Sequence, residues 1–150
     1  YKELCGARLE PVLENMKRIK RMGWWLEVTT LLIPEQNDSD EELRDMAAFI
    51  RDELDPDTPW HLSRFHPCYQ MTGTPTTPLA TLERAHAIGK EAGLNYIYLG
   101  NVPGREEGNT YCPDCGRTLI RRSGFSAGVL QIRNGNCCGC GRPIPGVDLG

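Results

Sequence analysis

The sequence has no long apolar run, and it has no basic stretch followed by an apolar one near its first residues. A helix that crosses a bilayer needs about 20 apolar residues, and a secretory signal peptide needs that basic-then-apolar order. A strong excess of charge of one sign is also missing, since the formal net charge is -3 and the pI is near 5.6. Because domains that bind nucleic acid present a strongly basic surface, we expect a cytoplasmic protein with neither a membrane nor a nucleic-acid partner.

At 150 residues the chain is too short for a complete eight-unit β/α barrel, which takes about 250 residues. The hydrophobic fraction of 39% and the charged fraction of 25% are typical of a globular protein that buries a core. The first residue is Tyr1 rather than methionine, within what reads as a continuing segment. We therefore expect that further chain precedes it in the natural protein.

Helical and strand patterns alternate three times over residues 1–104. Apolar residues at three- and four-residue steps predict helices, and runs of β-branched and aromatic residues predict strands. Regular alternation of this kind predicts right-handed crossovers and a parallel sheet. The expected order is helix 10–21, strand 24–33, helix 39–54, strand 60–66, helix 78–93 and strand 94–99.

Three strands leave two edges and part of one face of the sheet uncovered. The predicted fold class is therefore α/β, with residues 1–104 forming the parallel three-stranded β/α half of a partial, TIM-like barrel. Either the preceding chain or a second copy is expected to cover the open sheet. Residues 105–150 are expected to form a separate unit after a linker at 101–109, which is rich in glycine, proline and charged residues.

Local signals suggest several boundaries within the first unit. Ser39 and Glu42 stand three residues apart, as in a capping box at the start of a helix. Thr77 is the expected cap of the helix that follows the second strand. The neighbouring residues Trp24 and Trp25 are expected to pack in the core of the sheet.

Four of the seven cysteines form two C-x2-C pairs. Cys112 and Cys115 make the first pair, Cys137 and Cys140 make the second, and 21 residues separate them. This spacing is typical of a four-cysteine zinc site, so we expect a zinc-ribbon or rubredoxin-like tail that folds around a metal ion. Iron uses the same ligands, and a register with Cys138 in place of Cys137 stays open. A closed shell of four thiolates has no vacant position for a substrate, which favours a structural role.

Ligands of parallel β/α folds bind outside the carboxyl ends of the strands. At the end of strand 60–66, Arg64 and His66 place a cation and a titratable imidazole together, and His66 is suited to bind a carboxylate or to exchange a proton. Asn101 is the matching polar residue after the next strand. We expect His61, within its strand, and His86, on a helix, to have structural roles.

Five segments, in order along the chain, resemble the C-terminal part of the radical SAM proteins of the AmmeMemoRadiSam system, which are relatives of the pyruvate formate-lyase activating enzymes. They are residues 5–13, 27–34, 60–67, 101–104 and 109–116. The resemblance implies an intact enzyme with a six-stranded partial β/α barrel and a [4Fe-4S] cluster. That cluster would cleave S-adenosylmethionine (SAM) reductively to a 5'-deoxyadenosyl radical.

The resemblance also implies which residues would act. His66, Thr30 and Asn101 would line the SAM cavity, Arg64 joins them from its position alone, and the four paired cysteines would hold the tail's metal ion. The C-x3-C-x2-C motif that holds the family's cluster does not occur in this sequence. The chain would therefore supply the last three strands and the tail, and it would be inactive alone.

Two other functions are compatible with the same sequence. A non-catalytic zinc-binding module would recruit a partner through the exposed edge of the sheet. A rubredoxin-like electron carrier would hold iron at the four cysteines and would be coloured, whereas a zinc protein is colourless.

Overall fold

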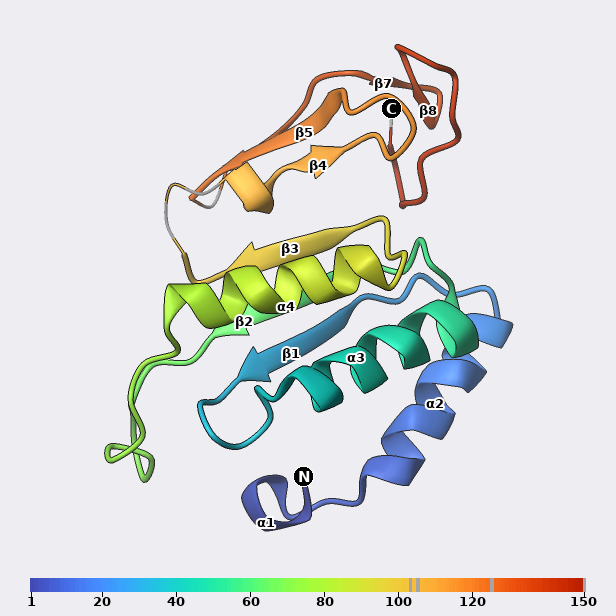
Figure 1. Cartoon of the computed structure of the whole chain (residues 1–150). Helices are drawn as coiled ribbons and strands as arrows, with labels where there is room; N and C mark the ends of the chain where they lie inside the picture. The colour runs from blue at the N-terminus through green and yellow to red at the C-terminus, as the bar shows by residue number, and fades with distance from the viewer. Residues whose placement is uncertain (103, 105, 125, 150) are drawn as a thin grey trace.

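The computed structural model of the chain describes residues 1–102, 104, 106–124 and 126–149. Helices and strands alternate in its first part, as the sequence predicts (Figure 1). The elements are α1 Lys2–Cys5, α2 Leu9–Arg21, β1 Val28–Leu32, α3 Asp40–Phe49, the π-helical turn η1 Ile50–Leu54, β2 Trp60–Arg64, α4 Leu79–Glu91 and β3 Ile97–Gly100. The three strands form one parallel sheet in the order β1-β2-β3, with Val28, Trp60 and Ile97 side by side.

Helices α3 and α4 cover one face of this sheet (Figure 1). Alternate strand residues point toward them, among them Leu32, Trp60 and Leu62, which have no exposed surface. Leu43 of α3 and Leu82 of α4 complete the same apolar core. Helix α2 contributes less to this core than its apolar periodicity predicts, because none of its residues is buried.

The opposite face of the sheet carries mostly polar or small residues. Thr29, His61 and Tyr98 lie side by side in register across the three strands, and Leu31, Ser63 and Gly100 lie together in the next row. All six residues are exposed or half-buried. Among the described residues, therefore, no layer of helices buries this face.

The prediction that Trp24 and Trp25 pack in the core is wrong. Strand β1 begins only at Val28, and the two indoles are 63% and 40% exposed. The reason is that they precede the part of the chain that pairs with β2, so no neighbouring strand or helix closes over them.

The prediction that Thr77 caps α4 is also wrong. The N-cap is Pro78, which forms no side-chain cap. The hydroxyl of Thr77 is fully buried, donates to the carbonyl of Leu32 at 2.6 Å and accepts the amide of Phe65 at 2.9 Å. Thr77 therefore joins the carboxyl ends of β1 and β2, a role that depends on residues far away in the sequence.

The tail is a separate β-rich unit with a small core. Its elements are the 3-10 turn η2 Glu106–Gly108, the antiparallel strands β4 Thr110–Tyr111, β5 Thr118–Ser123 and β6 Ser126–Val129, and the hairpin β7 Ile132–Arg133 with β8 Asn136–Cys137. Its buried apolar side chains are Leu119, Ile120 and Ile144, together with Cys112 and Cys137. So few apolar residues make a weak core, which is why cross-links or metal ions are common in units of this size.

The tail lies along the edge of the sheet at β3 (Figure 1). The hydroxyls of Tyr98 and Thr110 are 2.9 Å apart across this junction, and Arg142 contacts Asp57, with 3.2 Å between Nη2 and Oδ1. The chain's own tail thus lies along one edge of the sheet, and the cover of the open face by the preceding chain or a second copy stays a prediction. The sheet of the described residues has three strands, so a partial barrel would need further ones.

None of the described helices combines the length and apolarity that a membrane-spanning segment needs.

Candidate metal centre

Two similar turns carry the paired cysteines, at residues 112–117 and 137–142. In each turn the amide of the first cysteine donates to the carbonyl of the arginine five residues later, at 2.8 Å and 2.9 Å respectively. The amide of the glycine in each turn donates back to the carbonyl of the first cysteine, at 2.9 Å in both. These glycines, Gly116 and Gly141, have φ of 69° and 79°, which other residues rarely adopt. The repeated sequence C-x-x-C-G-R therefore encodes one backbone shape twice.

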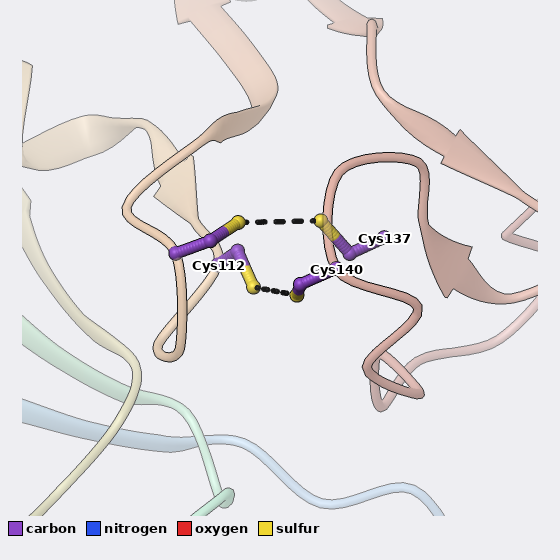
Figure 2. Close-up of side chains that lie close together, drawn as sticks. Cys112, Cys137 and Cys140 are labelled. Atoms are coloured by element: carbon purple, nitrogen blue, oxygen red, sulfur yellow. Dashed lines mark hydrogen bonds between the residues drawn. The ribbon is translucent and has the colours of Figure 1, made fainter.

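The two turns bring four sulfurs together. All the Sγ atoms of Cys112, Cys115, Cys137 and Cys140 lie within 4.8 Å of one another. The separations are 3.5 Å between Cys112 and Cys140 and 3.7 Å between Cys115 and Cys137, and Figure 2 shows the sulfurs of Cys112 and Cys140 facing each other. A tetrahedral ion with metal–sulfur bonds of about 2.3 Å needs sulfurs about 3.8 Å apart, whereas a disulfide needs about 2.05 Å. The four cysteines can hold a metal ion.

Cys138 lies outside this group. It is exposed, as are Cys115 and Cys140, whereas Cys112 and Cys137 are 1% and 2% exposed. The structure therefore assembles the set with Cys137, and the alternative register with Cys138 is not the one that forms. Since all four positions around an ion would be protein sulfurs, such a site has no place for a substrate.

The thiols differ in acidity before a metal ion binds. Hydrogen bonds from the amides of Cys140 and Gly139 lower the pKa of Cys137 to about 6. The amide of Arg142 favours the thiolate of Cys140, but the hydrogen bond to Cys112 and desolvation outweigh it, and the pKa of Cys140 rises to about 12. Negative charges this close repel one another, so a cation is needed to convert the whole set to thiolates.

The arginine of each turn reaches across to the other turn. Arg142 pairs with Asp114, with 2.5 Å between Nη1 and Oδ1. Arg117 lies over Gly139, where a Cβ atom would come within 3.1 Å of its Cζ. Asp114 and Gly139 are each the third residue of their turn. The arginine of each turn therefore contacts the equivalent position of the other turn. The two arginines therefore link the two cysteine turns to each other.

Of the four polar residues predicted to line a cofactor cavity, the structure brings Arg64 and Asn101 together. Nε of Arg64 donates to the carbonyl of Thr77 at 2.8 Å, and Nδ2 of Asn101 donates to the carbonyl of Arg64 at 3.1 Å, so these two lie together at the carboxyl edge. His66 is exposed in the loop that follows. Thr30 lies on the face that the helices cover, where its hydroxyl accepts from the indole of Trp60 at 2.9 Å. Arg64 stands in register with Leu32, on the same side of β2 as Trp60 and Leu62.

A polar cluster that the sequence reasoning missed lies on the open face of the sheet. Nε2 of His61 is 2.7 Å from a carboxylate oxygen of Glu27, and the other oxygen of Glu27 accepts from the indole of Trp25 at 2.9 Å. The rings of His61 and Tyr98 stack with 5.0 Å between centroids. The alternation of apolar and polar residues along β2 was the available signal, since it places His61 on the face opposite Trp60.

The next row of the open face holds Leu31, Ser63 and Gly100. A Cβ atom on Gly100 would lie 2.9 Å from Oγ of Ser63, so no larger residue fits there without movement. Tyr98 connects the cluster to the tail, since its hydroxyl bonds Thr110 and the guanidinium of Arg122 lies 5.1 Å from its ring centroid. The open face therefore offers hydrogen-bonding groups beside the exposed side chain of Leu31.

A cleft of about 690 Å³ lies between α4, β3 and the tail. Its lining includes His86, Lys90, Tyr96, Tyr111 and Cys112. Desolvation, with a smaller contribution from Lys90, lowers the pKa of His86 below its usual value. His86, which we expected to be structural, therefore presents a neutral imidazole to this cleft at neutral pH.

The chain is similar to a protein of Methanocaldococcus jannaschii that is described as uncharacterized. The two sequences are 49% identical over 146 residues, which is 96% of this chain but 44% of that relative. The chain thus spans less than half the length of the relative it matches. Comparison with models of protein families gives no match.

Proposed function

We propose that this chain is the C-terminal portion of a radical S-adenosylmethionine enzyme similar to the pyruvate formate-lyase activating enzymes. In this proposal the sheet forms part of a partial β/α barrel, its open face lines the SAM and substrate cavity, and the tail holds a structural zinc ion. The [4Fe-4S] cluster belongs to the rest of a longer protein, because the motif that would hold it is not in this chain.

The observation that carries the proposal is the difference between the two faces of the sheet. Open parallel sheets usually have helices on both faces, whereas in a β/α barrel helices surround the outside and inward side chains fill the interior. Here α3 and α4 cover one face, and the other presents His61, Ser63 and Tyr98 without a helical cover among the described residues. That arrangement is what a segment of barrel wall requires.

The polar residues take separate roles within this cavity. Arg64 and Asn101 lie at the carboxyl edge of the strands, where ligands of β/α folds bind, and His66 follows them in the loop. These three are the proposed contacts for SAM. Thr30 supports the wall from behind through Trp60 and is not proposed as a contact.

The metal ion in the tail is proposed to be zinc in a structural role. Four cysteines close the coordination shell, and zinc in such sites stabilises the fold directly. Iron fits the same four sulfurs, so metal analysis and the colour of the purified chain distinguish zinc from iron. A rubredoxin-like electron carrier requires iron and visible absorption in the purified chain.

The test uses a longer protein that contains this region, such as the archaeal relative, of which the matched region makes up 44%. After anaerobic reconstitution with iron and sulfide, we expect a reducible [4Fe-4S] signal in electron paramagnetic resonance and release of 5'-deoxyadenosine from SAM. The 150-residue chain treated in the same way is the control and should show neither. A longer protein that forms no such cluster, or that leaves SAM intact under reduction, would contradict the proposal.

A further inference from the structure

Two buried side-chain atoms of the described residues have no hydrogen-bond partner, and both belong to the junction between sheet and tail. They are the hydroxyl oxygen of Tyr96 and Nε of Arg142. Tyr96 directly precedes β3 and is only 4% exposed. Buried polar atoms in folded proteins are nearly always paired, so two unpaired donors in one junction indicate that an acceptor is missing there.

The same junction holds the metal centre against the sheet. Asp57, in the turn before β2, contacts Nη2 of Arg142 at 3.2 Å and accepts from Nδ2 of Asn95 at 2.5 Å. The carbonyl of Arg142 in turn accepts the amide of Cys137 at 2.9 Å. The chain of contacts therefore runs from the sheet, through the residue next to Tyr96, to one of the metal ligands.

Tyr96 and the other cysteine turn line the same cleft. The lining includes Cys112 and Pro113, Cys112 is among the groups that act electrostatically on Tyr96, and it is one of the two buried cysteines of the set. A thiol is a weak acceptor, but a metal-bound thiolate carries negative charge. Hydrogen bonds to a charged acceptor are about twice as strong as neutral ones. Loading the site with metal therefore creates charged acceptors in the junction that holds the two unpaired donors.

We propose that Tyr96 and Arg142 are positioning residues of the metal centre, whose unpaired O–H and N–H groups bond to the charged sulfurs of the loaded site, directly or through one water. Metal loading then holds the tail against the edge of β3 and fixes the wall of the cleft that contains Cys112. The inference rests on the metal-binding part of the proposed function, and it is independent of the radical chemistry.

Substitution of the tyrosine separates this role from simple packing. In Tyr96→Phe we expect Zn²⁺ affinity, measured by competition with a chelator, to fall about tenfold, as is common for such supporting residues. The sulfur-to-metal charge-transfer bands of the Co²⁺ derivative should shift as well. The zinc-free variant should resist urea as well as wild type or better, because phenylalanine removes a buried polar atom that has no partner. Tyr69→Phe is the matched control, because Tyr69 is 87% exposed.

A second variant tests the guanidinium. Arg142→Lys keeps the positive charge but lacks the Nε–H group, so we expect a similar loss of about tenfold in Zn²⁺ affinity. In wild type, removal of zinc should shift the nuclear magnetic resonance signals of Tyr98 and Thr110, whose hydroxyls bond across the junction.

The possible failures are distinguishable. If the wild-type chain binds no Zn²⁺, the assignment of the metal centre itself is wrong. If wild type binds Zn²⁺ and Tyr96→Phe has the same affinity and the same Co²⁺ bands, the inference is overturned while the metal centre stands. A variant that loses stability without zinc and keeps its zinc affinity would show that Tyr96 serves packing alone.

Discussion

Gly89 is the residue at which α4 comes closest to the sheet. A Cβ atom there would lie 2.6 Å from Cδ1 of Ile97 and 3.0 Å from a ring carbon of Trp60. Periodicity places Gly89 on the apolar face of its helix, but only the packed structure shows that the position has no room for a methyl group.

This contact reverses the usual effect of glycine in a helix. Gly89→Ala should gain about 1 kcal/mol of helix propensity, yet overpacking of this core costs about 1 to 3 kcal/mol, so we expect a net loss of stability. Ile97→Val removes the clashing methyl group and should recover part of the loss when combined with Gly89→Ala. Urea unfolding of the single and double variants measures both effects. Gly73→Ala, where nothing lies within 4 Å, is the control, and an unchanged or more stable Gly89→Ala would refute the packing argument.

At the scale of the element, the start of α3 forms as the sequence predicts. The hydroxyl of Ser39 accepts the amide of Glu42 at 3.3 Å and bonds its carboxylate at 2.9 Å. Helix α4 has no such cap, although the sequence predicts Thr77 in that role. The two helix starts differ because the Ser39 cap involves residues three apart, whereas Thr77 finds better partners on two strands.

Removal of this cap should therefore weaken α3. We expect Ser39→Ala to lower the free energy of unfolding by about 1 kcal/mol, because an amide in the first turn loses its acceptor. Ser39→Thr keeps a hydroxyl and should remain close to wild type. Urea denaturation followed by far-ultraviolet circular dichroism gives both values, and equal stability of the alanine variant and wild type would show that solvent replaces the cap without cost.

At the scale of the whole molecule, the two units are held together in different ways. The sheet unit buries a large apolar core against α3 and α4, whereas two of the five buried residues in the tail's core are the proposed ligands Cys112 and Cys137. The sheet therefore has its own source of stability, and we expect the tail to depend on a metal ion to order its cysteine turns.

Loss of one ligand should separate the two units. We expect Cys112→Ser to release most of the bound metal and to unfold the tail beyond about residue 109, while nuclear magnetic resonance signals of β1, β2 and β3 persist. The control is Cys138→Ser, which should keep the metal, because Cys138 lies outside the sulfur cluster. Full metal content in Cys112→Ser would show that the ligand set is wrong.

Much of the architecture could be predicted from local patterns. Alternating helices and strands, the capping box at Ser39 and the gathering of four cysteines all depend on residues close together or on a repeated motif, and the structure contains each of them. The face of the sheet on which each side chain lies was harder to predict. A strand that starts at Val28 rather than Trp24 changes which residues pair with β2, and it leaves both indoles outside the core.

The sequence by itself determined the parallel β/α order and the cysteine turns, because periodicity and the repeated C-x-x-C-G-R motif act within short stretches of chain. Only the tertiary structure decided that Thr30 turns to the helices, that His61 meets Glu27 on the open face, and that Arg142 bonds Asp57 beside Tyr96. The physical reason is that each of these contacts joins residues from different elements. Its formation depends on strand register and on how the tail docks, neither of which is encoded by neighbours in the sequence.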